Sequence, residues 1–412
     1  MMKDATPSDA AYVPSALQDF LLSDEDRAFR TEVRGMLASA LAPLADRIEN
    51  QDDWSAVKQG IRAIGEAGYL KLMFADLYRG SLSRPGLTHA TILSEEAAAI
   101  NYAFETTIGS ALSAAYPLHK HARPEVRERY LPGILDGSEI GAICVTEPDV
   151  GSDSAGMKTR IRYDGATDEW VIDGFKRYIS NASVADTYIV YGITDDAAPA
   201  QKGMTALVVP KETPGISFPR RYTFVGRRGC VVGEVRFEGV RVPAANLLGD
   251  VNGGFRIMLG MFNFERIILS GAALGVARTA FQIATDHAQT RVTFGQKLGC
   301  KQLVWDMIAQ MSSRIDAAEL ITYRAAKLYD AGLSGKDLAK PAAMAKLTST
   351  ETACFCADRT VQVLGGDGIT KEYGRAEQLF RDSRAMPIVA GTSEMAKYLI
   401  AGADMPALKP NL

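Results

Sequence analysis

A glutamate at the edge of an apolar helix face is the residue in this sequence best suited to abstract a proton. Met261, Phe264 and Ile268 recur at helical spacing and form an apolar stripe, and Glu265 lies about 40–60° from it. A carboxylate facing the packed side of a helix loses hydration, which raises its pKa toward that of a useful general base. Structural ion pairs outnumber bases, so a glutamate held by Arg266 or by solvent is the alternative interpretation of this helix alone.

Cysteine and histidine, the other residue types that carry much enzyme chemistry, show no site pattern. The five cysteines have no paired metal spacing, and the four histidines show no ligand pattern, so we predict no metal site. The odd number of cysteines suits a reducing compartment.

Composition and charge argue against several classes of protein. The chain has 412 residues, a formal net charge of -3 and no basic block, which argues against a nucleic-acid partner. No run reaches about 18 apolar residues, so we predict no membrane span. The segment Met1–Asp19 is acidic and does not look like a targeting peptide, so we expect a cytoplasmic protein.

The chain divides into an N-terminal arm and three blocks. We expect residues 1–22 to form a flexible arm and residues 23–137 to form a helical domain that starts at an N-cap, Ser23. Residues 138–249 are rich in short valine, isoleucine and aromatic runs separated by glycine, proline and aspartate, which is typical of an antiparallel β barrel or sandwich. Residues 250–412 return to helical periodicity and predict a four-helix bundle, giving an α+β fold overall.

Six short motifs occur in order along these blocks. By these motifs the chain resembles the acyl-CoA dehydrogenase family of flavoproteins, from about residue 23 to residue 402. The motifs are Cys144–Asp153, Lys176–Asn181, Phe237–Pro243, Arg291–Gln296, Gln362–Gly368 and Gly391–Glu394.

The resemblance implies an FAD site in two parts. The first part would hold the flavin ring, with Thr146 at its edge and Ser180 near N5. The second part would come from a neighbouring subunit and bind the pyrophosphate and adenine. The protein would therefore be a homodimer or homotetramer. The implied cofactor-binding residues are Ile143, Val145, Thr146, Gly151, Ser152, Tyr178, Ile179, Ser180, Arg291, Thr293, Phe294, Gln302, Gln362, Val363, Leu364, Gly365, Gly366, Thr392, Ser393 and Glu394.

The same resemblance bears on the base and the substrate. Many family members carry the base at the position of Ala390, which cannot take a proton, whereas a subset that includes isovaleryl-CoA dehydrogenases takes its base from the position of Glu265. A second departure is Tyr178, where tryptophan is usual. The residues implied to bind substrate are Ser152, Asn263, Phe264, Arg266, Ala390 and Gly391.

The resemblance therefore implies α,β-dehydrogenation of a short or branched acyl-CoA, with Glu265 taking the α proton, FAD taking the β hydride and an electron-transfer flavoprotein as acceptor. A dehydrogenase acting on acyl groups bound to an acyl-carrier protein in secondary metabolism is the first alternative. A non-catalytic flavoprotein of the DNA-repair-associated branch and an oxidase or monooxygenase on the same scaffold are the others.

Overall fold

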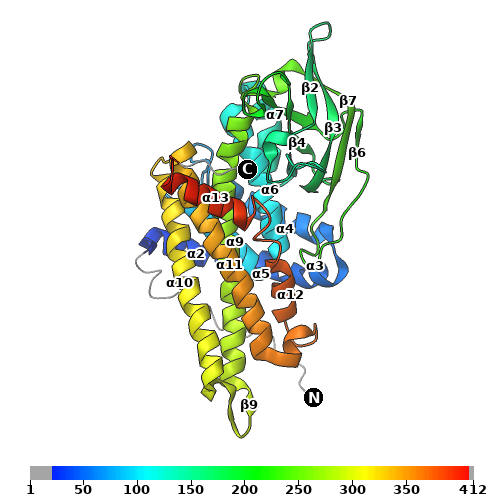
Figure 1. Cartoon of the computed structure of the whole chain (residues 1–412). Coiled ribbons are helices and arrows are strands. Elements are labelled where there is room, and N and C mark those ends of the chain that lie inside the picture. Colours follow the sequence, from blue (N-terminus) through cyan, green and yellow to red (C-terminus); the bar gives the residue numbers. More distant parts are fainter. Residues whose placement is uncertain (1–20, 408–412) are drawn as a thin grey trace.

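A computed structural model describes residues 21–407, so most of the expected N-terminal arm lies outside the described residues. The chain forms a helical N-terminal part, a β-sheet part and a long helical bundle, as expected (Figure 1). The N-terminal helices are α2 (Asp24–Ala40), α3 (Ala45–Gln51), α4 (Trp54–Glu66), α5 (Leu87–Ile100), α6 (Tyr102–His121) and α7 (Pro124–Leu135).

Helix α2 begins where its sequence predicts. The Ser23 hydroxyl accepts a hydrogen bond from the amide of Asp26, and the Asp26 carboxylate accepts one from the amide of Ser23. These reciprocal bonds satisfy two amide groups that a helix start would otherwise leave unpaired. After α2, Pro43 lies in a short 3-10 turn, Ala42–Leu44, that interrupts the helical path of the chain.

The middle of the chain forms one eight-stranded sheet, with β1 pairing to β4 beside the strand order β6-β7-β3-β2-β4-β5-β8. The expectation of antiparallel strands is wrong in two places: β1 runs parallel to β4, and β2 meets β4 in parallel at one pair. A parallel neighbour requires a long connection, and periodicity within single strands carries no information about that pairing. The strands are β1 (Gly141–Cys144), β2 (Arg160–Asp164), β3 (Glu169–Ser180), β4 (Thr187–Ile193), β5 (Met204–Pro210), β6 (Ile216–Ser217), β7 (Val232–Pro243) and β8 (Leu247–Leu248), with the short helix α8 (Ala200–Gly203) before β5.

Three long helices dominate the C-terminal part, and α9 runs through its whole length (Figure 1). Within the described residues α9 is the one helix long and apolar enough to cross a membrane by length and composition, and 78% of its apolar window is buried inside the fold. The elements are α9 (Gly254–Thr290), the hairpin β9 (Val292–Thr293) and β10 (Gln296–Lys297), α10 (Gln302–Asp330), α11 (Gly335–Leu364), α12 (Ala376–Ser383) and α13 (Ser393–Asp404).

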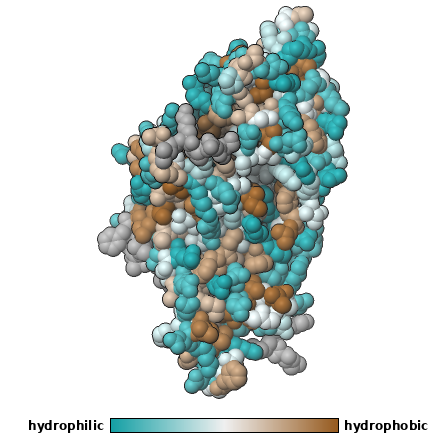
Figure 2. Space-filling view, in the orientation of Figure 1, coloured by the Kyte–Doolittle hydropathy of each residue, from teal (hydrophilic) through white to brown (hydrophobic). Residues whose placement is uncertain are grey.

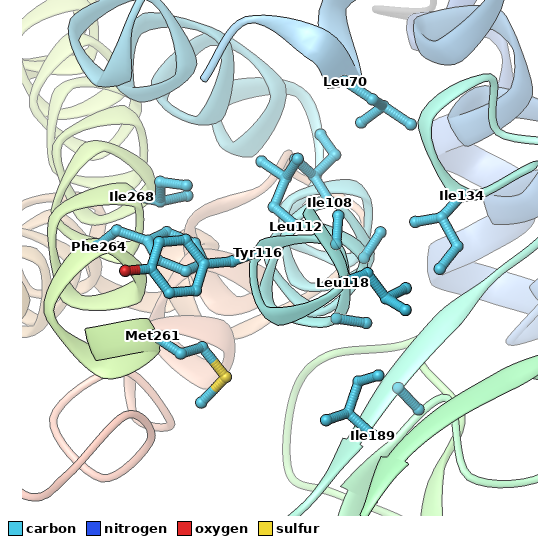
Figure 3. Packing of buried hydrophobic residues seen from close by; sticks show 14 of the residues in the cluster. Leu70, Ile108, Leu112, Tyr116, Leu118, Ile134, Ile189, Met261, Phe264 and Ile268 are labelled. Carbon is cyan, nitrogen blue, oxygen red and sulfur yellow. The ribbon is translucent and has the colours of Figure 1, made fainter. Parts of the chain in front are cut away.

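The first third of α9 contacts the N-terminal helices through a buried core. Phe264 is fully buried, and its ring lies 4.8 Å from that of Tyr116 on α6. Figure 3 shows these two rings side by side, with Met261 and Ile268 on the adjoining turns of α9. This packing confirms the apolar stripe predicted from the sequence and fixes the rotation of the helix that carries Glu265.

Candidate active site

Glu265 holds an unpaired carboxylate inside the protein. Its Oε2 atom is completely buried and has no hydrogen-bond partner among the described residues. Burial raises the pKa of Glu265 to about 7, and the neighbouring guanidinium of Arg266 opposes that rise without cancelling it. A buried acceptor without a donor is costly for stability alone, so this carboxylate is poised to accept a proton from a bound molecule.

Arg266 connects Glu265 to the segment that precedes α13. Its Nε donates to the carbonyl oxygen of Ala390 at 3.1 Å, and its Nη1 lies 3.4 Å from Oδ1 of Asn263. Asn263 in turn donates to the carbonyl oxygen of Gly335 at 2.8 Å. The structure therefore brings Asn263, Arg266 and Ala390 together beside Glu265 and gives the first two a positioning role.

The segment of Ala390 and Gly391 turns sharply. Both residues have positive φ, 54° and 91°, and Thr392 then caps α13 by accepting a hydrogen bond from the amide of Met395 at 3.3 Å. Lys346, which the sequence analysis did not single out, donates from Nζ to the carbonyl oxygen of Pro387 at 2.8 Å. These bonds hold the turn in place against α9 and α11.

The turn after β1 is anchored by a buried ion pair. The carboxylate of Glu147 accepts a 2.9 Å hydrogen bond from Nζ of Lys176 on β3, and it also accepts bonds from the amides of Lys158 and Thr159. Lys176 further donates to the carbonyl oxygen of Val145 at 3.2 Å. These contacts fix the backbone of Val145 and Thr146.

Next to that turn, β3 presents an exposed aromatic ring. Tyr178 has a φ of 57° and lies within an irregularity in the pairing of β3 with β7, between Lys176 and Ile179. It is 48% exposed, its ring is tilted against that of Tyr222, and the guanidinium of Arg177 lies over its face. The amide of Arg177 donates to the carbonyl oxygen of Thr146 at 2.8 Å. The exposed ring of Tyr178 and the rigid polar turn after β1 lie side by side. Together they form a surface suited to a planar aromatic group.

The candidate residues on the hairpin after α9 and at the adjoining helix ends lie at the opposite end of α9 from Glu265. At about 1.5 Å per residue, Arg291 is roughly 39 Å along the helix axis from Glu265, and the hairpin with Thr293 and Phe294 forms the tip of the bundle (Figure 1). The side chain of Phe294 is 97% exposed. Within one chain these residues therefore lie far from Glu265.

Models of three domain families match almost the whole chain. The acyl-CoA dehydrogenase N-terminal domain matches residues 23–138, the middle domain residues 142–240 and the C-terminal domain residues 252–403. The chain belongs to the acyl-CoA dehydrogenase family. This confirms the resemblance and the three-part fold expected from the six motifs.

Curated family members align over nearly their full length. A probable acyl-CoA dehydrogenase, YngJ, of Bacillus subtilis is 33% identical over 93% of this chain and 98% of its own. The mitochondrial isovaleryl-CoA dehydrogenase of Pongo abelii is 32% identical over 93% of this chain and 89% of its own.

Solved structures of the family agree with the fold. A glutaryl-CoA dehydrogenase in complex with glutaryl-CoA superimposes with a TM-score of 0.88 at 29% identity, over 95% of this chain and 98% of that chain. A glutaryl-CoA dehydrogenase from Mycobacterium smegmatis in complex with FADH2 gives a TM-score of 0.83 at 25% identity, over 94% and 96% of the two chains.

Within this family fold, the structure places the candidate residues in three groups. Asn263, Arg266, Ala390 and Gly391 surround Glu265, while Phe264 is part of the hydrophobic core. Thr392, Ser393 and Glu394, at the start of α13, adjoin this first group. A second group lies on β1, on β3 and in the turn that follows β1, and a third lies at the far end of the bundle. The second group comprises Ile143, Val145, Thr146, Gly151, Ser152, Tyr178, Ile179 and Ser180, and the third comprises Arg291, Thr293, Phe294, Gln302, Gln362, Val363, Leu364, Gly365 and Gly366.

Sequence reasoning missed the residues that support the site from behind. Glu147 and Lys176 both lie inside the six motifs, but their ion pair was not predicted because the two residues are 29 positions apart. No local pattern indicated the pair, because Glu169, Asp173 and Arg177 lie on the same strand and Lys176 is one charged residue among several. Tyr191 on β4, also buried without a hydrogen-bond partner for its hydroxyl within the described residues, carried no signal because tyrosine is common in strands.

Proposed function

We propose that this chain is an FAD-dependent dehydrogenase that desaturates a short or branched acyl-CoA between its α and β carbons. The observation that carries the proposal is the buried, unpaired Oε2 of Glu265. Its carboxylate accepts the α proton, and a pKa of about 7 leaves a substantial fraction ionised near neutral pH.

FAD, when bound, accepts the hydride that leaves the β carbon. The backbone of Val145 and Thr146, with Tyr178 and Ser180, is suited to hold its ring system, since the Glu147–Lys176 pair keeps this turn rigid. Arg266 positions the Ala390 turn and keeps the pKa of Glu265 from rising further. Ala390 leaves room for the acyl chain next to the base, because a methyl group stands where a longer side chain would project.

We further propose that the working enzyme is a homodimer or homotetramer. Arg291, Thr293, Phe294 and Gln302 would serve the FAD of a neighbouring subunit, since the single chain holds them roughly 39 Å from Glu265. The bundle tip and its neighbourhood expose large apolar side chains, and Figure 2 shows hydrophobic residues spread over the lower half of this face. The most exposed are Phe294 at 97%, Leu303 at 80%, Ile369 at 72% and Trp305 at 69%.

The carrier of the acyl group and the electron acceptor belong to the same proposal. The names of the relatives favour CoA over an acyl-carrier protein, and an electron-transfer flavoprotein is the acceptor we expect. The test is anaerobic reduction of the bound flavin by matched acyl groups on CoA and on a carrier protein. Flavin reduction by short or branched acyl-CoAs supports the proposal. Reduction by carrier-bound acyl groups alone would identify the carrier protein, and not CoA, as the bearer of the acyl group. Reduction by neither contradicts the proposal.

A further inference from the structure

Tyr178 lies at a bulge where two residues of β3 face a single residue of β7. The pairing of the two strands shifts between Lys176 and Ile179, so that Arg177 and Tyr178 together lie opposite Glu234. Tyr178 has a φ of 57°, a conformation that a residue other than glycine adopts at a cost. A bulge of this kind turns a side chain away from the regular alternation of its strand. The Tyr178 ring therefore needs partners that keep it in the position the bulge gives it.

The guanidinium of Arg177 covers one side of that ring. Its central carbon lies 4.6 Å from the centre of the Tyr178 ring and 5.6 Å from the centre of the Tyr222 ring, and a cation over an aromatic face is attracted by the ring electrons. The two tyrosine rings are tilted against one another, with their centres 4.9 Å apart. Because Tyr178 is still about half exposed, part of its ring stays open to a ligand.

A chain of hydrogen bonds fixes the direction of the Arg177 side chain. Its Nε donates to the Tyr222 hydroxyl at 2.8 Å, and this hydroxyl donates to the carboxylate of Glu234. The backbone amide of Arg177 donates to the carbonyl oxygen of Thr146 at 2.8 Å. Arg177 therefore contacts both parts of the surface proposed for the flavin ring, the turn after β1 through its backbone and Tyr178 through its side chain.

We propose that Arg177 is a positioning residue that holds the Tyr178 ring against the bound flavin, and that its positive charge favours the reduced flavin over the oxidised one. The inference rests on the proposed function, which puts the flavin ring at Tyr178 and the turn of Thr146. Hydride transfer adds one negative charge to the flavin ring, and a nearby cation stabilises that charge. Glu234 offsets the cation only in part, because the Tyr222 hydroxyl lies between the carboxylate and the guanidinium.

The test is the reduction potential of FAD bound to the purified enzyme, measured against a redox dye, together with the dissociation constant of oxidised FAD. Arg177→Met removes the charge and keeps a long side chain. We expect it to shift the balance between reduced and oxidised flavin about tenfold toward the oxidised form, a fall of about 30 mV for a two-electron couple. We also expect it to bind oxidised FAD several-fold more weakly, because the Tyr178 ring loses its support.

Two further variants separate the charge from the positioning. Arg177→Lys keeps the charge and loses the rigid fork that bonds Tyr222, so it should restore most of the potential while oxidised FAD stays weakly bound. Tyr222→Phe removes only the hydroxyl that holds Arg177, so it should weaken FAD binding and lower the potential less than Arg177→Met does. Circular dichroism reports whether each variant is folded, and these two variants carry the comparison if Arg177→Met is not.

Arg236→Met is the matched control, because its guanidinium lies 5.0 Å from the centre of the Phe175 ring across the same two strands and outside every candidate site. It should keep the wild-type potential and FAD affinity. A wild-type potential and affinity in the Arg177 variants, or equal losses in Arg236→Met, would overturn the proposal. A wild-type enzyme that binds no FAD would instead overturn the proposed function, which keeps the two failures apart.

Discussion

The guanidinium of Arg266 donates from Nε to the carbonyl oxygen of Ala390 at 3.1 Å, across 124 positions of sequence. This contact ties the helix that carries Glu265 to the turn before α13. It also places a positive charge next to the proposed base, whose pKa it lowers. The position of Ala390 and the protonation of Glu265 thus depend on one side chain.

Replacing Arg266 with methionine should therefore move the pH profile. The wild-type rate constant for flavin reduction should rise with pH through about 7, because Glu265 must be ionised to accept the proton. Arg266→Met removes the charge that lowers the pKa of Glu265, so the rise should shift to higher pH. Stopped-flow reduction across the pH range measures the shift. Asn263→Ala, which removes a neutral contact of Arg266, serves as the control, and a shift to lower pH in Arg266→Met would contradict this arrangement.

Glu105 on α6, which is only 3% exposed, should make the protein less stable as pH increases. Its pKa is raised from 4.5 to about 8, so the folded state binds the proton more tightly than the unfolded state does. Stability from this group is complete below about pH 4.5 and declines as pH rises to about 8. Urea unfolding at about pH 5 and pH 9 should show that Glu105→Gln removes part of the wild-type decline, roughly 4 kcal/mol at most. An equal decline in both proteins would show that Glu105 is ionised in the fold.

The buried pair of Glu147 and Lys176 should be sensitive to loss of the lysine. Lys176→Met leaves a buried carboxylate without its cation, which should cost about 3–5 kcal/mol of unfolding free energy and weaken flavin retention. The nearby Lys158 pairs with Asp149 at an exposed position, so Lys158→Met should leave the unfolding free energy almost unchanged. Thermal unfolding and the flavin-to-protein absorbance ratio measure both effects. Equal losses in the two variants would mean that burial of the pair is unimportant.

Two inactive variants should complement one another if the site is shared between subunits. Glu265→Gln lacks the base, and Arg291→Ala lacks the arm proposed to serve the neighbour's cofactor. A mixed dimer contains one site with both residues intact, so refolding the two together should recover about a quarter of wild-type activity from random pairing of subunits. Mixing each variant with more of itself is the control. Recovery no greater than that of the controls would place Arg291 outside a shared site.

The packed side of the helix that carries Glu265, the order of the three parts and the start of α2 were predicted from the sequence because each depends on local signals; the role of Glu265 as base stays a prediction. Glu265 was placed by helical periodicity together with a family motif, and Ser23 by its own capping pattern. The parallel pairing of β1 with β4 and the helix α12 were not predicted. Register between strands that are distant in sequence, and a short helix of eight residues, depend on tertiary contacts that local patterns do not record.

The supporting residues were missed for a related reason. The hydroxyl of Ser94 on α5 lies 3.3 Å from Oε1 of Glu105, and the charge of Glu265 on α9 adds to the rise in the pKa of Glu105. On the sequence it is one acidic residue in the first turn of a helix, where acidic residues are common. Burial and the absence of a cationic hydrogen-bond partner within the described residues distinguish it, and both require coordinates.

The most direct measurement of the central claim is single-turnover flavin reduction in the Glu265→Gln variant. Wild type, Glu265→Gln and the exposed control Glu128→Gln, on α7 and outside every candidate site, are loaded with FAD and mixed anaerobically with the best short or branched acyl-CoA. We expect Glu265→Gln to keep its flavin and to lose at least about 10²–10⁴-fold in the reduction rate constant, because the amide accepts no proton. The control should remain near wild type. Reduction of the Glu265→Gln flavin at the wild-type rate would show that Glu265 is not the base.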